Sequence, residues 1–110
     1  MLRVVVGGFG EVAIRGIRAI LPPPEFALTD CTIDAVVNVV AAIQPDALVL
    51  NSGKDSDCTL AASVARAHPG MTVVACSAEG TAMSVYPRSG GGWVTSRSLS
   101  AAALIECVRG

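Results

Sequence analysis

Short apolar runs alternate along the chain with longer segments in which apolar residues recur every three or four positions. Runs of the first kind predict buried strands, and the second spacing predicts helices that pack through one face. The expected strands are Leu2–Val6, Phe26–Asp30, Ala47–Asn51, Met71–Cys76 and Trp93–Thr95. The expected helices are Glu11–Leu21, a helix capped by Thr32 that reaches Ile43, Cys58–Ala67, a short one in Gly80–Tyr86, and one from Ser98 or Ser100 to Val108.

Five strands alternating with five helices predict a doubly wound parallel sheet in a single α/β domain, residues 1–110. Turn-forming clusters end the helices: three prolines follow Leu21, and His68-Pro69-Gly70 follows the third helix. The second helix is expected to bury a single apolar face formed by Ile33, Val36, Val37, Val40 and Ile43.

Composition narrows the class of protein. The chain has 110 residues, of which 52% are hydrophobic, and a net charge of −1, which gives no basic footprint for nucleic acid. The cysteines have no Cys-x-x-Cys spacing and no nearby histidine, which favours reduced thiols over disulfides or a zinc site: Cys31, Cys58, Cys76 and Cys107. No apolar run approaches the roughly 18 residues of a membrane span, and no signal peptide precedes the first strand, so we expect a cytoplasmic protein without membrane contact.

The first and last expected helices have weakly charged faces. Ile14 and Ile17 lie near the two arginines of the first helix, and the last helix is rich in alanine. Faces of this kind are typical of subunit contacts. We therefore expect a homodimer formed through the first helix, the last helix or the segment Gly80–Tyr86.

The strand that begins at Ala47 is expected at the centre of the sheet, and it ends in the turn-forming residues Asn51-Ser52-Gly53. In open α/β sheets, ligands bind beyond the carboxyl ends of the strands. Asn51 is therefore a candidate site residue. Its amide could form a structural hydrogen bond at this edge or bind a ligand there.

A glycine-rich turn follows the first strand. Gly8-Phe9-Gly10-Glu11-Val12-Ala13 has the spacing G-x-G-x-x-A, and Asp30 ends the second strand. This arrangement resembles the Rossmann dinucleotide-binding fingerprint, in which the glycines admit a pyrophosphate and the acid binds a ribose hydroxyl. The resemblance implies NAD or a related dinucleotide as a ligand of Gly8, Gly10 and Asp30, with Ala13 at the third small position.

A second resemblance spans nearly the whole chain. Pro45-Asp46 followed by four apolar residues and Asn51 is similar to the phosphorylation motif of the receiver domains of two-component response regulators. Gly92-Trp93-Val94-Thr95-Ser96 before the last helix resembles receivers that precede a LuxR-type helix-turn-helix. The resemblance implies a flavodoxin-like (βα)5 fold with strand order 2-1-3-4-5.

The residues that perform phosphorylation in that family are replaced here. The phosphoacceptor aspartate corresponds to Asn51, and the two magnesium-binding acids correspond to Gly7 and Gly8. The lysine that ends the fifth strand corresponds to Ser96. An amide is a poor nucleophile, and Mg²⁺ requires hard anionic ligands. The resemblance is therefore to a degenerate receiver, or pseudo-receiver.

Two further positions retain the type of residue found in the family. Ser77 corresponds to the hydroxyl residue after the fourth strand, and Trp93 to the aromatic residue whose rotation reports activation. The resemblance implies a non-enzymatic, phosphorylation-independent regulator without cofactor or metal. It also implies a homodimer, a crater at Gly7, Gly8, Asn51, Ser77 and Ser96 that could bind a small molecule, and DNA binding only through a helix-turn-helix expected beyond residue 110.

Overall fold

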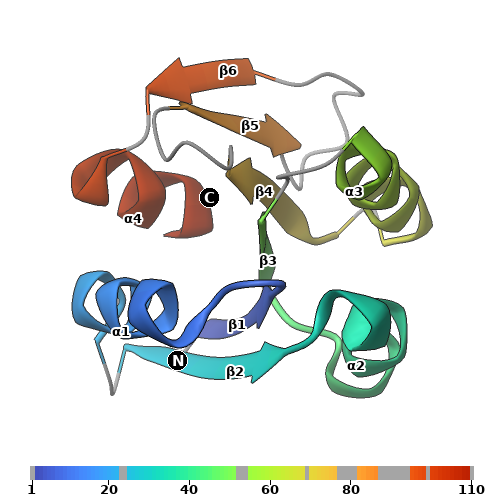
Figure 1. The fold of residues 1–110 in the computed structure, drawn as a ribbon, viewed down its shortest axis with the longest axis horizontal. Helices are drawn as coiled ribbons and strands as arrows, with labels where there is room; N and C mark the ends of the chain where they lie inside the picture. Colours follow the sequence, from blue (N-terminus) through green and yellow to red (C-terminus); the bar gives the residue numbers. More distant parts are fainter. Residues whose placement is uncertain are drawn as a thin grey trace.

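The computed structural model describes residues 2–22, 25–51, 55–68, 70–76, 82–86, 95–98 and 100–109, and for 55–59, 82–83 and 95–98 it describes the backbone alone. The helices cover both faces of one sheet. Figure 1 shows α1 (Glu11–Ile20) and α4 (Ala101–Arg109) on one face, and α2 (Val36–Ile43) and α3 (Asp55–Ala67) on the other. A short 3₁₀ turn, η1 (Ile33–Ala35), precedes α2.

The sheet has six strands in the order β2-β1-β3-β4-β5-β6. The strands are β1 (Leu2–Gly7), β2 (Phe26–Cys31), β3 (Ala47–Asn51), β4 (Thr72–Cys76), β5 (Ala82–Tyr86) and β6 (Thr95–Ser98). The predicted α/β class and the order 2-1-3-4-5 are confirmed. This is the strand order of flavodoxin-like folds.

The prediction that all strands run parallel is wrong for the part of the sheet beyond β4. The segment expected as a short helix, Gly80–Tyr86, contains β5, which pairs antiparallel with β4. A parallel crossover needs a dozen or more residues, and only residues 77–81 join the two strands. The chain therefore turns back beside β4. The strand expected at Trp93–Thr95 lies further along as β6, antiparallel to β5 and outermost in the sheet.

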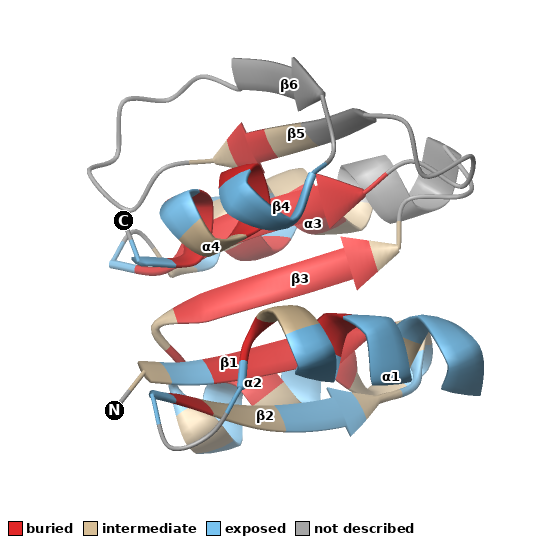
Figure 2. Cartoon of the chain, turned by 90° about the vertical axis from the view of Figure 1, so that its left-hand side faces the viewer, coloured by how far each residue is buried: buried red, intermediate tan, exposed pale blue. Residues whose placement is uncertain are grey.

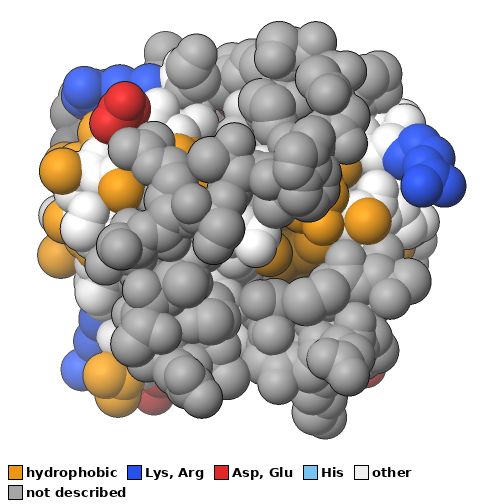
Figure 3. Space-filling view, turned by 90° about the horizontal axis from the view of Figure 1, so that it is seen from above, with side chains coloured by type: hydrophobic (Ala, Val, Ile, Leu, Met, Phe, Trp, Pro, Cys, Tyr) orange, Lys and Arg blue, Asp and Glu red, His pale blue; other side chains and the backbone are white. Residues whose placement is uncertain are grey.

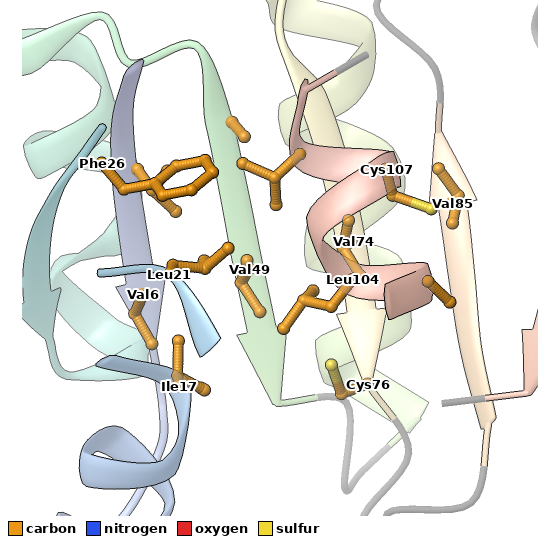
Figure 4. Close-up of a cluster of buried hydrophobic side chains, with 14 residues drawn as sticks. Val6, Ile17, Leu21, Phe26, Val49, Val74, Cys76, Val85, Leu104 and Cys107 are labelled. Carbon is orange, nitrogen blue, oxygen red and sulfur yellow. The ribbon is translucent and has the colours of Figure 1, made fainter. Parts of the chain in front are cut away.

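Two apolar clusters fill the spaces between the sheet and its helices. Figure 4 shows the cluster on the α1 and α4 face, where Leu21, Val49 and Leu104 meet. The cluster on the α2 and α3 face contains Leu48, Val36 and other buried residues. Because both faces of β1, β3 and β4 are covered, consecutive apolar residues are buried in each strand: Val4–Val6, Ala47–Leu50 and Val73–Cys76. These are the continuous apolar runs from which the sequence predicted buried strands.

The second and third helices differ most from the expected ones. The second helix is divided into η1 and α2, and Val37 is 53% exposed instead of lying on the buried face. Val36 and Val40 provide the fully buried contacts of α2. The third helix begins at Asp55, not Cys58. At the last helix, Ser100 Oγ accepts a hydrogen bond of 3.1 Å from the Ala103 amide, which matches the predicted cap.

The end of α4 is joined to the start of β2 by an exposed ion pair. Arg109 Nε and Nη2 donate to the two carboxylate oxygens of Glu25 at 2.7 and 2.8 Å. Among the described residues, no helix is both long and apolar enough to cross a membrane.

This ion pair predicts a pH dependence of stability. The hydrogen bonds from Arg109 lower the pKa of Glu25. A carboxyl group with a lowered pKa stabilises the fold above its ordinary titration range, about pH 4.3, and this stabilisation is lost as the pH falls through the lowered pKa. Thermal melting between pH 3 and 6 should show a smaller loss of stability on acidification for Glu25→Gln than for the wild type. Identical pH profiles would contradict the role of Glu25.

Candidate functional site

Gly7, Gly8 and Asn51 lie together at the carboxyl ends of the neighbouring strands β1 and β3. In the β1–β3 register Gly7 is opposite Leu50, so Gly8 and Asn51 follow on neighbouring strands. Asn51 Nδ2 donates a hydrogen bond of 3.1 Å to the Gly8 carbonyl in a partly buried position. The amide thus connects the end of β3 to the turn after β1.

Gly7 has no space for a side chain. A Cβ built on this buried residue would lie 2.5 Å from Cγ2 of Val36 and 3.1 Å from Cδ2 of Leu50. The first distance is far below van der Waals contact, so a side chain here would have to displace Val36. Apolar atoms of α2 and β3 therefore occupy the volume in which the receiver resemblance would have a magnesium-binding acid.

Gly8 is constrained by its backbone. Its φ is +81°, a left-handed conformation that glycine adopts without the strain that other residues incur. A Cβ there would also lie 3.2 Å from Cδ1 of Ile33. The Gly8 amide donates to the Cys31 carbonyl at 3.2 Å, so the turn is fixed between the ends of β2 and β3.

The side chains described at this edge provide no ready nucleophile. Asn51 is a neutral amide, and the half-buried Cys31 thiol has its pKa raised, mainly by burial and further by the charge of Asp30. At the end of β4, burial raises the pKa of Cys76 to about 11. Both thiols are therefore protonated at neutral pH, which makes them weak nucleophiles and weak metal ligands. Among the described residues, no group of three or more His, Cys, Asp and Glu is arranged to hold a metal ion.

Of the other predicted crater residues, only Ser96 can be placed relative to this cluster. Ser77 and Trp93 lie outside the described residues. Ser96 is on β6, opposite Ser84 of β5, and its side chain is outside the described part. Because β4 and β5 separate β6 from β3, the two backbones are about 14 Å apart at the usual strand spacing.

The residues of the dinucleotide fingerprint occupy the expected elements, with different contacts. Gly10 precedes α1, and a Cβ built on it meets no atom within 4 Å. Asp30 is near the end of β2, but its Oδ1 accepts from Arg18 Nη2 at 3.5 Å. Ala13 is exposed, and Glu11 adds a negative charge in the first turn of α1. A pyrophosphate at this helix terminus would lie beside that carboxylate.

Two surface hollows lie away from Asn51. One, of about 410 Å³, is at the amino ends of β3 and β4, and the other, of about 420 Å³, lies between α2 and the first two strands. The first is lined by Gln44, Pro45, Asp46, Ala67, His68, Gly70 and Met71. The second is lined by Arg3, Val4, Ala27, Thr29, Ala42 and Ile43. None of the residues that line these hollows is a predicted crater residue.

Sequence reasoning missed the residues that close the edge, Ile33 and Val36. Both were expected on the apolar face of the second helix, but their position over the glycine turn was not anticipated. One signal could have indicated it: Gly7 and Gly8 are adjacent at the end of a strand, and glycine often marks the close approach of another element. Comparison with family models, curated proteins and solved structures finds no match to this chain.

Proposed function

We propose that this chain is a receiver-like regulatory domain that acts without phosphorylation and without catalysis. The observation that carries the proposal is the hydrogen bond from Asn51 Nδ2 to the Gly8 carbonyl. The residue at the acceptor position of the resemblance is engaged in holding the fold, and Val36 fills the adjacent volume at Gly7. A carboxylate acceptor and magnesium ligands, both required for phosphoryl transfer to a protein side chain, have no counterpart at these positions.

We propose that the domain regulates a cytoplasmic transcription factor by setting the geometry of its dimer. DNA would be bound by a helix-turn-helix outside these residues. In agreement with this division, the Arg side chains of the described residues lie in separate groups, not in one patch, on the face in Figure 3. A small molecule at the carboxyl edge of the sheet remains part of the proposal as a means of control.

The proposal predicts that the chain will not accept a phosphoryl group. After incubation with acetyl phosphate and Mg²⁺, intact mass spectrometry should show no added phosphoryl group on the wild type or on Asn51→Asp. The variant supplies the carboxylate but not the metal ligands, so its mass should also stay unchanged. A phosphorylatable receiver domain treated in parallel provides the positive control. A phosphoryl adduct on the wild type would overturn the proposal, and one on Asn51→Asp alone would show that this edge can still bind the metal.

A dinucleotide-binding module is the second candidate, and the open space at Gly10 is the observation in its favour. It requires NAD to raise the melting temperature and Asp30→Ala to abolish the rise. The Arg18–Asp30 ion pair and the carboxylate of Glu11 place it second, because both oppose the binding of a dinucleotide.

A further inference from the structure

Helix α1 has a second apolar face that no described part of the chain covers. The buried residue of this helix is Ile17, which packs into the core. Val12 is 84% exposed, the most exposed large apolar side chain among the described residues. Ala13, Gly16 and Ala19 are also exposed, and Figure 2 shows much of α1 in the colour of exposed residues. Ordinary surface helices place charged and polar residues on that side.

This face has a projection and a depression one helical turn apart. Residues four apart are neighbours on a helix surface, with Cβ atoms about 6 Å from each other, so Val12 lies next to Gly16. A Cβ built on Gly16 meets no atom within 4 Å, so the surface is indented there and open to solvent. Glycine is less favourable than alanine within a helix, and no contact among the described residues accounts for a glycine at this position.

Opposite charges lie beside the projection and the depression. Arg15 Nη2 donates to Glu11 Oε1 at 3.0 Å, and both side chains are largely exposed. The acid is toward the amino end of α1 and the base toward its carboxyl end. If a second α1 lay antiparallel to the first, the acid of each helix would approach the base of the other, and Val12 of each would face Gly16 of the other. The face is thus complementary to itself in shape and in charge.

We propose that α1 binds α1 of a second copy of this chain, antiparallel and around a two-fold axis. A two-fold contact uses the same patch on both subunits and closes after two copies. The contact would be centred on Val12 and Gly16, with Glu11 of one copy paired with Arg15 of the other at the rim. This inference rests on the proposed function in one respect, because it supplies the interface of the proposed regulatory dimer.

The first test compares two matched substitutions in the full 110-residue chain. Val12→Asp and Val37→Asp both replace an exposed valine with an acid in the first turn of a helix, where a negative charge is compatible with the helix dipole. Sedimentation velocity should show dimers for the wild type and Val37→Asp, and a dimer affinity at least about tenfold weaker for Val12→Asp. Circular dichroism should show that both variants are folded. A monomeric wild type, or equal dimerisation of both variants, would overturn the proposal.

The second test identifies the antiparallel arrangement. Glu11→Arg and Arg15→Glu each place like charges opposite each other in a homodimer, so each variant alone should be more monomeric than the wild type. In an equimolar mixture, a heterodimer places the introduced arginine opposite the introduced glutamate. It also places the retained Arg15 of one variant opposite the retained Glu11 of the other, so dimers should reappear.

A mixture as monomeric as its components would overturn the antiparallel contact. A monomeric chain that also accepts no phosphoryl group would refute this inference and the proposed output through dimer geometry, and would leave only the proposal that the domain acts without phosphorylation.

Discussion

Replacing Gly7 with Ala is expected to destabilise the folded chain by about 1–3 kcal/mol, the usual cost of forcing a methyl group into a packed core. The added Cβ would lie 2.5 Å from Val36 Cγ2, and Leu50 closes the opposite side at 3.1 Å. Gly7→Asp should cost more, because it also buries a carboxylate without a partner. Urea denaturation followed by circular dichroism would measure both losses.

A double-mutant cycle would attribute this cost to one contact. Val36→Ala removes the obstructing methyl group, so Gly7→Ala should cost less in that background than in the wild type, by about 0.5 kcal/mol or more. Gly70→Ala is the matched control, because a Cβ built on Gly70 meets no atom within 4 Å. Additive effects of the Gly7 and Val36 substitutions would show that α2 does not close this edge.

Replacing Asn51 is the second substitution with a large expected effect. Asn51→Ala leaves the Gly8 carbonyl without its partly buried donor, which should cost about 1–3 kcal/mol. Asn51→Asp should cost more at neutral pH, because a carboxylate would face a carbonyl oxygen. On acidification the Asn51→Asp variant should recover part of this loss, since a protonated carboxyl group can donate to the same oxygen. Chemical denaturation at pH 4 and pH 7 would measure the difference.

Asn38 provides the control for this substitution. It is an exposed residue of α2, so Asn38→Asp should change stability by less than about 0.5 kcal/mol. If Asn51→Asp changed the free energy of unfolding as little as Asn38→Asp, the hydrogen bond from Asn51 to the Gly8 carbonyl would contribute little to stability. The structural role that the proposed function assigns to Asn51 would then be refuted.

The central part of the fold could be predicted from local pattern. The predicted bounds of α1, β1, β3 and β4 agree with the structure to within one or two residues. The strands could be recognised because a strand covered on both faces is largely apolar. Gly7, Gly8 and Asn51 lie at one edge because the carboxyl ends of neighbouring parallel strands share it. Ser77 and Trp93 lie outside the described residues, so their predicted roles stay predictions.

Beyond β4, the local pattern of apolar residues was not sufficient to predict the type of element or the direction of the strands. Ala82–Tyr86 is short enough to be a strand or a helical turn, and its direction follows from the length of residues 77–81 and from pairing with β4. The exposure of Val37 was also not predictable from the local pattern, because the 3₁₀ turn η1 before α2 changes which residues of the helix face the sheet. Both outcomes depend on which neighbour the segment contacts, and a periodicity within the segment does not contain that information.

The sequence by itself determined the α/β class, the strands β1, β3 and β4, and the uncharged residue types of Gly7, Gly8 and Asn51, since these follow from residue type and spacing. Only the tertiary structure decided what surrounds these residues: Val36 and Ile33 pack over the glycine turn, and Asn51 donates to the Gly8 carbonyl. It also decided that α1 has one face in the core and another, around Val12, in solvent. The physical reason is the same in each case, because a side chain's partner is fixed by the packing of elements distant in sequence.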